Sequence, residues 1–297
     1  MSMFQKTGAF PDPADPPRVA VSGSAGGIGS SLVPLLEAHG CEVVELPDES
    51  SAASLPPDLR CDVFVNLAWR GSRGPLRADC SLQIDMVRRS IDYYALARRM
   101  GCRRFICPGT IGELMVETPG CGGLRSENSV YVSAKCFLHR VLLAKEDPEC
   151  KVVWARLGNI YGPGDTGNLV GWTLERILKG EKAAFGPALQ PYEFVAKDDC
   201  ARALAALVEA PELSRDSYYI GVGEPRELGS LLREIGRLAG REELVAIGMR
   251  PDDGTRYRAE WFDISPLTAD TGFRPAVGFS DGVLALIERI GRKGEGA

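Results

Sequence analysis

Tyr131 and Lys135 are the residues of this sequence whose types and spacing point most directly to chemistry. They stand four residues apart in the segment Tyr131-Val-Ser-Ala-Lys135, and residues four apart lie on one face of a helix. A tyrosine hydroxyl ordinarily has a pKa of about 10, and a neighbouring ammonium ion lowers that pKa because it stabilises the phenolate. The pair therefore predicts acid–base chemistry in which Tyr131 exchanges a proton, although the same spacing also occurs on solvated helix faces.

Three glycines form a second group with a chemical use. Gly23, Gly26 and Gly29 directly follow the apolar run at residues 18–22 and precede a helical pattern. Glycine permits positive φ in a tight turn, its bare backbone lets a pyrophosphate approach, and the amides of a helix N-terminus favour negative charge. A strand before the turn and a helix after it indicate a dinucleotide site. The residues of this turn expected to contact the cofactor are Gly23, Ala25, Gly26, Gly27, Ile28 and Gly29.

The elements that must position these residues are alternating strands and helices. Short, nearly continuous apolar runs are typical of strands in a parallel sheet that helices cover on both faces. We expect an α/β fold: a Rossmann-type, doubly wound parallel sheet with a smaller α/β C-terminal substrate lobe. The expected parts are a loose leader at 1–17, a dinucleotide-binding core with the catalytic residues at 18–165 and a mainly substrate-binding lobe at 166–297. Strands are expected at 18–22, 41–46, 62–67, 104–107 and 151–156, and helices at 80–100, 168–180, 198–210 and 227–239.

Composition and charge argue against several other classes of function. The chain has 297 residues, of which 44% are hydrophobic and 25% charged, as is ordinary for a globular protein. A net charge of −5 without a basic stripe argues against nucleic acid as a partner. The sequence holds no apolar run long enough to predict a membrane helix.

The two histidines and nine cysteines predict neither a metal site nor a disulfide framework. The cysteines are odd in number and none belongs to a Cys-x-x-Cys pair, whereas zinc sites and disulfide scaffolds use paired spacing. Several of them stand inside apolar runs, so we expect small core residues in a reducing compartment. The sequence therefore predicts a cytoplasmic protein without a metal.

Taken together, these segments resemble the extended branch of the short-chain dehydrogenase/reductase superfamily, in its NAD-dependent epimerase/dehydratase family. The spacing G-x-x-G-x-x-G and the Tyr-x-x-x-Lys pair are both typical of that branch. The stretches Asn66-Leu-Ala68 and Arg156-Leu-Gly-Asn-Ile-Tyr-Gly-Pro-Gly164 resemble two further motifs of the family. The resemblance covers roughly residues 18–290, so it concerns almost the whole chain.

The resemblance implies a third catalytic residue beside Tyr131 and Lys135. Thr110 follows the strand expected at 104–107, where the family places a Ser or Thr that binds the substrate oxygen. Ile111 and Gly112 then replace the Asp-Glu pair of the family's dehydratases. A 4,6-dehydratase is therefore not expected.

The resemblance also extends the expected cofactor site. Leu67 and Ala68 would pass the cofactor, and Asp48 is the nearest acidic residue to the ribose position, where Pro47 replaces the family's usual Asp. No Lys or Arg lies in 42–59 to hold a 2′-phosphate. We therefore expect NAD, with NADP as the alternative.

A nucleoside-diphosphate sugar is the substrate that the resemblance implies. Arg250 resembles the arginine that binds the diphosphate, and the helix that begins near Asn168 would offer amides to the same group. Tyr192 replaces an arginine that is common in the family, so the pocket is not a standard one. The residues expected to bind substrate are Trp69, Asn159, Asn168, Tyr192 and Arg250.

Three functions fit these observations. The first is hydride transfer, dependent on NAD or NADP, at a ring carbon of the nucleotide sugar, with C4 expected, by an epimerase or a 4-ketoreductase. The second is NAD(P)H-dependent reduction of a non-sugar carbonyl, and the third is a catalytically silent cofactor-binding protein. The resemblance further implies a homodimer formed through the helices at 80–100 and 131–146.

Overall fold

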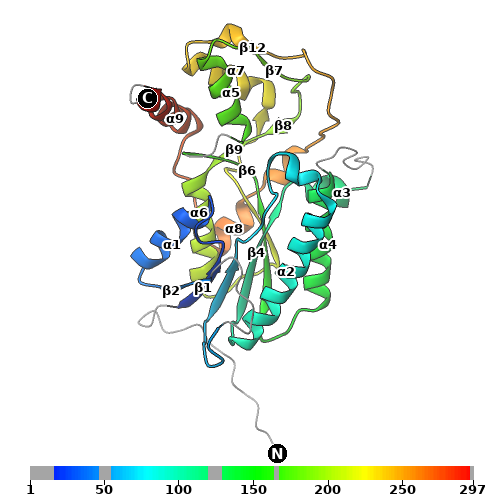
Figure 1. Cartoon of the computed structure of the whole chain (residues 1–297), viewed down its shortest axis with the longest axis vertical. Coiled ribbons are helices and arrows are strands. Elements are labelled where there is room, and N and C mark those ends of the chain that lie inside the picture. Colours follow the sequence, from blue (N-terminus) through cyan, green and yellow to red (C-terminus); the bar gives the residue numbers. More distant parts are fainter. Residues whose placement is uncertain (1–16, 47–54, 120–128, 164–166, 295–297) are drawn as a thin grey trace, which may run out of the picture.

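A parallel sheet forms the centre of the computed structural model, which describes residues 17–46, 55–119, 129–163 and 167–294. Its strands are β1 (Arg18–Ser22), β2 (Glu42–Leu46), β3 (Val63–Asn66), β4 (Arg104–Thr110), β5 (Lys151–Leu157) and β10 (Ser217–Ile220). Their order in the sheet is β10-β5-β4-β3-β1-β2 (Figure 1). The inner strands β3 and β4 are buried along nearly their whole length, which agrees with their continuous apolar sequences.

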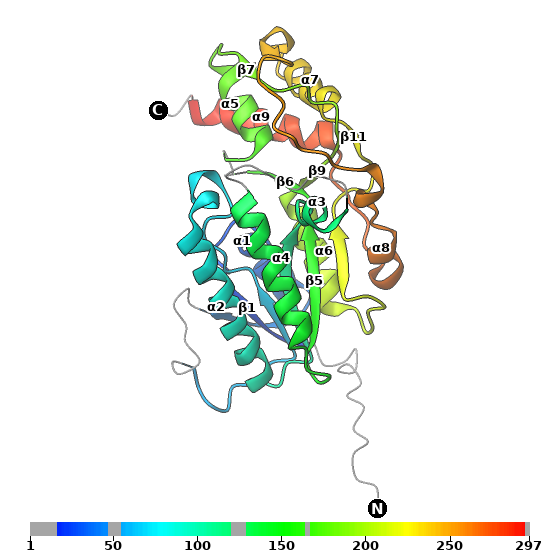
Figure 2. The same ribbon diagram turned by 90° about the vertical axis from the view of Figure 1, so that its right-hand side faces the viewer.

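Helices cover both faces of this sheet (Figures 1 and 2). The helices packed on it are α1 (Gly29–Ala38), α2 (Cys80–Arg99), α4 (Ser129–Ala144) and α6 (Lys197–Glu209). α1 and α6 pack together on one face, where they bury Val19 and Val21. α2 and α4 pack together on the other face, where Ala20 is buried. Neighbouring residues of β1 thus point to opposite helix layers, and the predicted doubly wound parallel sheet is confirmed.

A smaller lobe of helices and short strands stands above the carboxyl ends of the strands (Figure 1). Its elements are β6 (Asn159–Tyr161), α5 (Leu169–Leu178), β7 (Ala183–Ala184), β8 (Pro191–Tyr192), β9 (Phe194–Ala196), β11 (Arg226–Glu227), α7 (Leu228–Leu238), η3 (Glu242–Leu244), β12 (Val245–Ala246) and α9 (Phe279–Gly294). α5, α7 and α9 pack around a separate hydrophobic cluster that includes Phe194. Because α6 and β10 return to the sheet, chain order alone does not separate the two parts, and the division at residue 165 stays a prediction.

Four further short elements connect these parts. They are the 3₁₀ helix η2 (Gly74–Ala78), α3 (Glu113–Glu117), the 3₁₀ helix η4 (Ala259–Phe262) and α8 (Ser265–Thr271). η2 follows β3 and packs on α2 and α4, while α3 follows β4 and packs on α4. Both therefore lie close to the carboxyl end of the sheet.

The structure corrects two details of the sequence prediction. β4 runs on to Thr110 instead of ending at residue 107, because its pairing with β5 continues to Thr110 opposite Leu157. Cys80 is exposed at the start of α2, whereas the other described cysteines are buried as expected. The predicted leader up to residue 16 and the predicted cofactor residue Asp48 lie outside the described residues.

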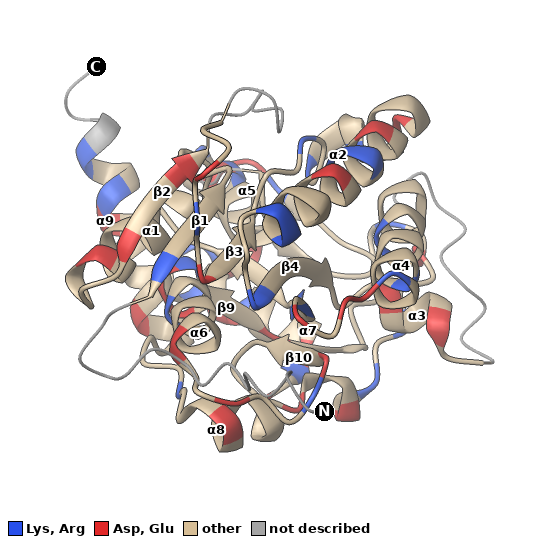
Figure 3. Cartoon of the chain, turned by 90° about the horizontal axis from the view of Figure 1, so that it is seen from below, with Lys and Arg blue, Asp and Glu red and all other residues tan. Residues whose placement is uncertain are grey.

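Charges of both signs are mixed on the outer helices. Figure 3 shows acidic and basic residues alternating along α2, where Arg88 pairs with Asp85 at 4.0 Å and with Asp92 at 3.5 Å. Within the described ranges, every helix is too short or too polar to span a membrane.

Arg104, at the start of β4, ties the sheet to the end of α6. It is buried, and its guanidinium donates hydrogen bonds to the carbonyl oxygens of Leu207, Val208 and Ala210. Carbonyl groups in the last turn of a helix have no partner within the helix. Burial lowers the pKa of Arg104 to about 10. The charged guanidinium is thus disfavoured by burial, but it supplies the hydrogen-bond donors that these carbonyls need.

We expect Arg104→Met to lower the free energy of unfolding by about 2–4 kcal/mol, because buried carbonyl groups lose their donor. Urea denaturation would measure the change. Arg99→Met, at an exposed position in the last turn of α2, is the control and should change stability by less than about 0.5 kcal/mol. A loss for Arg104→Met no larger than that of the control would contradict the prediction.

Candidate active site

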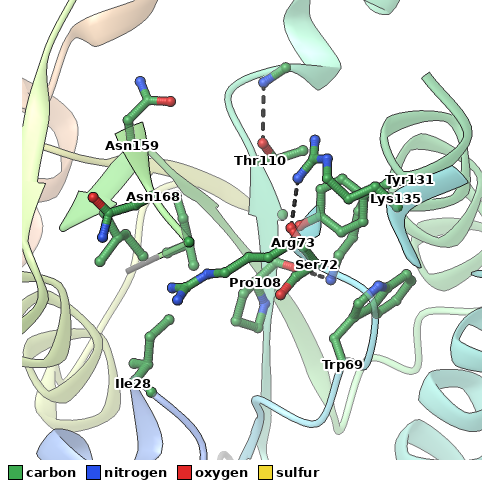
Figure 4. A pocket seen from close by; sticks show the side chains of 18 of the residues that line it. Ile28, Trp69, Ser72, Arg73, Pro108, Thr110, Tyr131, Lys135, Asn159 and Asn168 are labelled. Carbon is green, nitrogen blue, oxygen red and sulfur yellow. Dashed lines mark hydrogen bonds between the residues drawn. The ribbon is translucent and has the colours of Figure 1, made fainter. Parts of the chain in front are cut away.

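A cavity of about 600 Å³ lies at the carboxyl ends of β1, β3, β4 and β5. β2 and β3 pair with opposite sides of β1, so the strand order reverses at this point of the sheet. Open α/β sheets bind ligands at such switch points, beyond the carboxyl ends of the strands. Figure 4 shows the side chains that surround the cavity, which come from the sheet, α4 and the small lobe.

Backbone crowding explains two glycines of the turn after β1. Gly23 has a φ of +71°, and a Cβ at this position would lie 2.7 Å from the amide nitrogen of Ala68. A Cβ on Gly29 would collide with the carbonyl oxygens of Gly23 and Ser24. Both positions therefore require glycine, Gly23 because the turn packs on the chain that leaves β3 and Gly29 because the turn folds closely on itself.

The remaining residues of the turn differ in how they face the cavity. Gly26, Gly27 and Ile28 line it, as does Leu67 after β3. A Cβ on Gly27 would meet no other atom within 4 Å, so the wall here is bare backbone at the start of α1. Such a helix start can bind a phosphate through its amides. Ala25 is exposed and does not form part of the cavity wall.

α4 brings Tyr131 and Lys135 to the cavity, where β4 ends at Thr110. Tyr131 is 7% exposed and Lys135 is 3% exposed. The Lys135 Nζ donates a hydrogen bond of 2.8 Å to the Pro108 carbonyl and lies 6.0 Å from the centre of the Tyr131 ring. The structure thus places the three predicted catalytic residues around one space (Figure 4).

Burial opposes the charged forms of both Tyr131 and Lys135. It raises the pKa of Tyr131 to about 12, although the nearby Arg77 guanidinium acts in the opposite direction. Burial also lowers the pKa of Lys135 to about 8. The protein alone therefore holds Tyr131 as a protonated phenol at neutral pH, and added positive charge favours its ionisation.

Trp69 contacts the ammonium of Lys135. The Nζ atom lies 3.5 Å from the centre of the indole ring, which is a cation–π contact. The indole also meets the Tyr131 ring edge-on, with 6.1 Å between the ring centres, and its Nε1 donates a hydrogen bond of 3.0 Å to Gln83 Oε1. Trp69, predicted as a substrate residue, lines the cavity and also fixes Lys135.

Two arginines in the segment after β3 line the cavity, although the sequence did not predict them as site residues. Arg77 lies in η2, with its guanidinium carbon 4.3 Å from the centre of the Tyr131 ring. Figure 4 shows Arg73 reaching across the cavity toward Asn168 and Ile28. The available signal was the recurrence of arginine in this segment, but the pattern does not determine which side chains turn inward.

Glu113, which the sequence also did not predict, is a buried carboxylate just beyond the end of β4. It accepts hydrogen bonds from the Thr110 amide at 2.6 Å, the Trp154 indole at 2.8 Å and the Arg156 guanidinium at 3.2 Å. A Cβ on Gly109 would lie 2.5 Å from Glu113 Oε1, so glycine leaves the space for this carboxylate. The network fixes the backbone that carries the Thr110 hydroxyl.

Glu113, Glu117 and His139 are the described residues close enough together to contact one ion, with ligand atoms within 4.8 Å of one another. Arg156 already pairs with both carboxylates, at 3.2 Å from Glu113 and 2.9 Å from Glu117. The guanidinium supplies the positive charge that this buried acidic pair requires. The group is therefore an ion-pair network and gives no ground for a metal site.

The small lobe contributes Asn159, Asn168 and Tyr192 to the cavity wall. The Tyr192 hydroxyl donates a hydrogen bond of 2.7 Å to Asn159 Oδ1, and its ring stacks on Tyr257, with 5.7 Å between the ring centres. Asn168 is the N-cap of α5, where its side-chain oxygen accepts a hydrogen bond of 2.9 Å from the Gly171 amide. Asn168 thus directs the start of a helix at the cavity. Tyr257 is a lining residue that the sequence did not indicate.

Arg250 is not on the wall of this cavity but lines a second one, of about 630 Å³. Its guanidinium carbon lies 5.5 Å from the centre of the Trp172 ring. The two cavities adjoin, and the residues common to both are Leu169, Asp253, Thr255 and Tyr257. The predicted substrate residues are therefore divided between the two cavities. The first cavity is lined by Trp69, Asn159, Asn168 and Tyr192, and the second by Arg250.

The comparisons with known proteins agree with this architecture. Residues 19–221 match the model of the NAD dependent epimerase/dehydratase family. None of the curated proteins matches the chain. Three similar solved structures show a shared fold.

The first, MoeE5 in complex with UDP-glucuronic acid and NAD, is 22% identical, with a TM-score of 0.73 over 93% of this chain and 99% of its own. The second, the UDP-glucose 4-epimerase of Thermus thermophilus in complex with NAD, is 24% identical, with a TM-score of 0.69 over 91% of this chain and 98% of its own. The third, the dTDP-glucose 4,6-dehydratase of Bacillus anthracis in complex with NAD, is 16% identical, with a TM-score of 0.69 over 94% of this chain and 97% of its own.

We expect Lys135→Met to stabilise the protein at about pH 7 by about 1–2 kcal/mol. Because burial lowers the pKa of Lys135 to about 8, the charged ammonium destabilises the folded protein below that pH, whereas the unfolded chain carries no such penalty. As the pH rises from about 8 to about 10, the folded protein loses this proton first, so the penalty and the gain from methionine both shrink. Urea denaturation at about pH 7 and about pH 9.5 would measure the difference.

Lys145→Met, at an exposed position beyond the end of α4, is the matched control and should have little effect at either pH. A destabilisation by Lys135→Met that is equal at both pH values would contradict the prediction, because it would mean that burial does not disfavour the charged form of Lys135.

Proposed function

Since the chain belongs to the NAD-dependent epimerase/dehydratase family, we propose that it is a nucleotide-sugar enzyme that moves hydride at a ring carbon, C4, of a nucleoside-diphosphate sugar, as an epimerase or a 4-ketoreductase. The observation that carries this proposal is the two-part site. Thr110, Tyr131 and Lys135 surround the first cavity, and Arg250 lines the one that adjoins it. An extended ligand with a reactive ring and an anionic group suits this layout.

The residues of the first cavity fit a nicotinamide dinucleotide. The bare backbone at Gly26 and Gly27, at the start of α1, suits a pyrophosphate. Leu67 and Lys135 line the same cavity and would hold the ribose and nicotinamide part of the dinucleotide. When bound, the dinucleotide supplies the hydride acceptor or donor. NAD is proposed and NADP is the alternative, because no Lys or Arg lies in 42–59 to hold a 2′-phosphate.

In this proposal, Tyr131 is the residue that exchanges the proton with the substrate. Its hydroxyl gives a proton to the sugar oxygen during reduction and takes one during oxidation. The Thr110 hydroxyl holds the same oxygen, and the Lys135 ammonium stabilises the phenolate. Burial of Tyr131 and Lys135 keeps water from competing for that proton.

The second cavity suits the nucleotide end of the substrate. Arg250 offers a planar guanidinium that can bind a phosphate through two hydrogen bonds. Trp172 and Phe185 line the same space and offer aromatic surface to a base. The alternative function of reducing a non-sugar carbonyl would leave this cavity without a ligand. Catalytically silent binding would leave Thr110, Tyr131 and Lys135 without a role.

We also propose that the enzyme is not a 4,6-dehydratase. Elimination of water from the sugar needs an additional acid and base near the ring. Ile111, at one of the two positions concerned, is buried against Tyr219 and Phe262, and Gly112 has no side chain. Glu113 is engaged by Trp154 and does not line the cavity.

The retained cofactor distinguishes the two forms of the proposal. We expect protein that is purified and then denatured to release about one NAD per chain if it is an epimerase, because an epimerase keeps its dinucleotide through the cycle. We expect a protein free of dinucleotide that oxidises added NADPH with a 4-keto sugar nucleotide if it is a reductase. Enzymatic assay of the supernatant for NAD and NADP would measure this.

Tyr131→Phe tests the chemistry that both forms share. The variant should bind dinucleotide as before but lose turnover by about 10²–10⁴-fold, since the proton donor is gone. Tyr93→Phe, at a buried tyrosine of α2 outside the cavity, is the matched control. Unchanged turnover of Tyr131→Phe with a cognate sugar nucleotide would refute the mechanism.

We further propose a homodimer through α2 and α4. These helices pack side by side and expose Ile84 and Phe137, which are 67% and 59% accessible. We expect light scattering to give about twice the chain mass of 32.1 kDa, and the variant Ile84→Glu/Phe137→Glu to give the chain mass, because charge at an apolar interface is unfavourable. Leu284→Glu, at an exposed position of α9, is the control. A monomer in the unaltered protein would contradict the proposal.

A further inference from the structure

Two cations lie close to the ring of Tyr131. The guanidinium carbon of Arg77 lies 4.3 Å from the ring centre, whereas the Lys135 Nζ lies 6.0 Å from it. Lys135 also interacts with two other groups. It donates a hydrogen bond to the Pro108 carbonyl, and its ammonium makes a cation–π contact with the Trp69 indole. Arg77 is therefore the closer of the two to the ring.

We propose that Arg77 is a second cation, beside Lys135, that stabilises the phenolate of Tyr131. The inference rests on the proposed role of Tyr131 in proton exchange. An opposite charge within about 4–6 Å of an ionisable group favours its charged form, and the effect is stronger in a buried site because water screens it less. Arg77 acts through Tyr131 and is thus a positioning residue.

The fold holds the Arg77 guanidinium in place. Its Nη1 donates a hydrogen bond of 2.7 Å to the carbonyl of Ser72. The 3₁₀ helix that carries it is anchored by Gln83, whose Nε2 donates hydrogen bonds of 2.9 Å to the carbonyls of Leu76 and Gly71. Gln83 is 1% exposed, so this anchor is part of the core under α2.

The other charged groups around Tyr131 do not make Arg77 redundant. Arg73 adds positive charge from the same segment, while Glu113 on α3 and Cys107 on β4 act in the opposite direction. Burial raises the pKa of Tyr131 to about 12 with both arginines present. Loss of Arg77 leaves the burial penalty in place and removes an opposing charge.

The test replaces Tyr131 by 3-fluorotyrosine and follows its fluorine NMR signal as the pH is raised. Fluorine makes the phenol more acidic, so its titration falls at a lower pH than that of tyrosine, and circular dichroism at each pH establishes that the protein is folded. We expect Arg77→Gln to shift this titration upward by about one unit or more, which is about a tenfold loss of phenolate at a given pH. Glutamine keeps a donor for the Ser72 carbonyl and removes the charge. The measurement is made without nucleotide or substrate.

Two further variants complete the test. Arg77→Lys, which keeps the charge on a different stem, should titrate between the unaltered protein and Arg77→Gln. Arg70→Gln, on the same segment but exposed and away from the cavity wall, should cause no shift. Circular dichroism establishes which variants are folded.

A folded Arg77→Gln that titrates with the unaltered protein would overturn the inference. If that variant does not fold, Arg77→Met also removes the charge, and a folded Arg77→Met that titrates with the unaltered protein would overturn the inference instead. Failure of the proposed function is a separate result, because it appears as unchanged turnover of Tyr131→Phe and leaves these titrations unaffected.

Discussion

The hydrogen bond from the buried ammonium of Lys135 to the Pro108 carbonyl is the interaction on which the candidate site depends. It joins α4 to β4, and it thereby sets Tyr131, one helical turn earlier, beside Thr110 at the end of the strand. An ammonium in this position is costly to bury. The indole of Trp69 offsets part of that cost through its π face. Burial of the ammonium thus lowers stability but provides a direct contact between α4 and β4.

A second hub, Glu113, fixes the end of the same strand through a single side chain. One carboxylate satisfies the Thr110 amide, the Trp154 indole and the Arg156 guanidinium. The strand end that bears Thr110 is therefore fixed by side chains that lie outside the cavity. Residues that surround a site in this way set its geometry as firmly as those that line it.

Much of the site could be predicted from sequence because its signals are local. The glycine turn and the Tyr131–Lys135 pair each depend on spacing within a single strand–turn–helix or a single helix, and the structure places them around one cavity. The sheet could be predicted for the same reason, since buried parallel strands have continuous apolar sequences. Thr110 required its position after the fourth strand together with the resemblance to the family.

The residues that were missed owe their positions to packing between distant segments. Arg77 reaches Tyr131 because η2 packs on α2 and α4, and no spacing in the segment reveals this. Glu113 is buried by Trp154 and Arg156, which are 41 and 43 residues away in sequence. The extension of β4 depends on its partner strand. Arg250 belongs to a motif, but its place on the second cavity, away from Tyr131, depends on how the small lobe folds.

The amide of Gln83 shows how hydrogen-bond complementarity can restrict a position that never touches the cavity. Its oxygen accepts from the Trp69 indole, while its nitrogen donates to the carbonyls of Gly71 and Leu76. A glutamate in its place would have no donor for those carbonyls, a lysine no acceptor for the indole, and an asparagine would be one methylene too short. Glutamine is the standard amino acid that meets all three demands. The residue type at position 83 is therefore set by the number and placement of hydrogen-bond donors and acceptors around it.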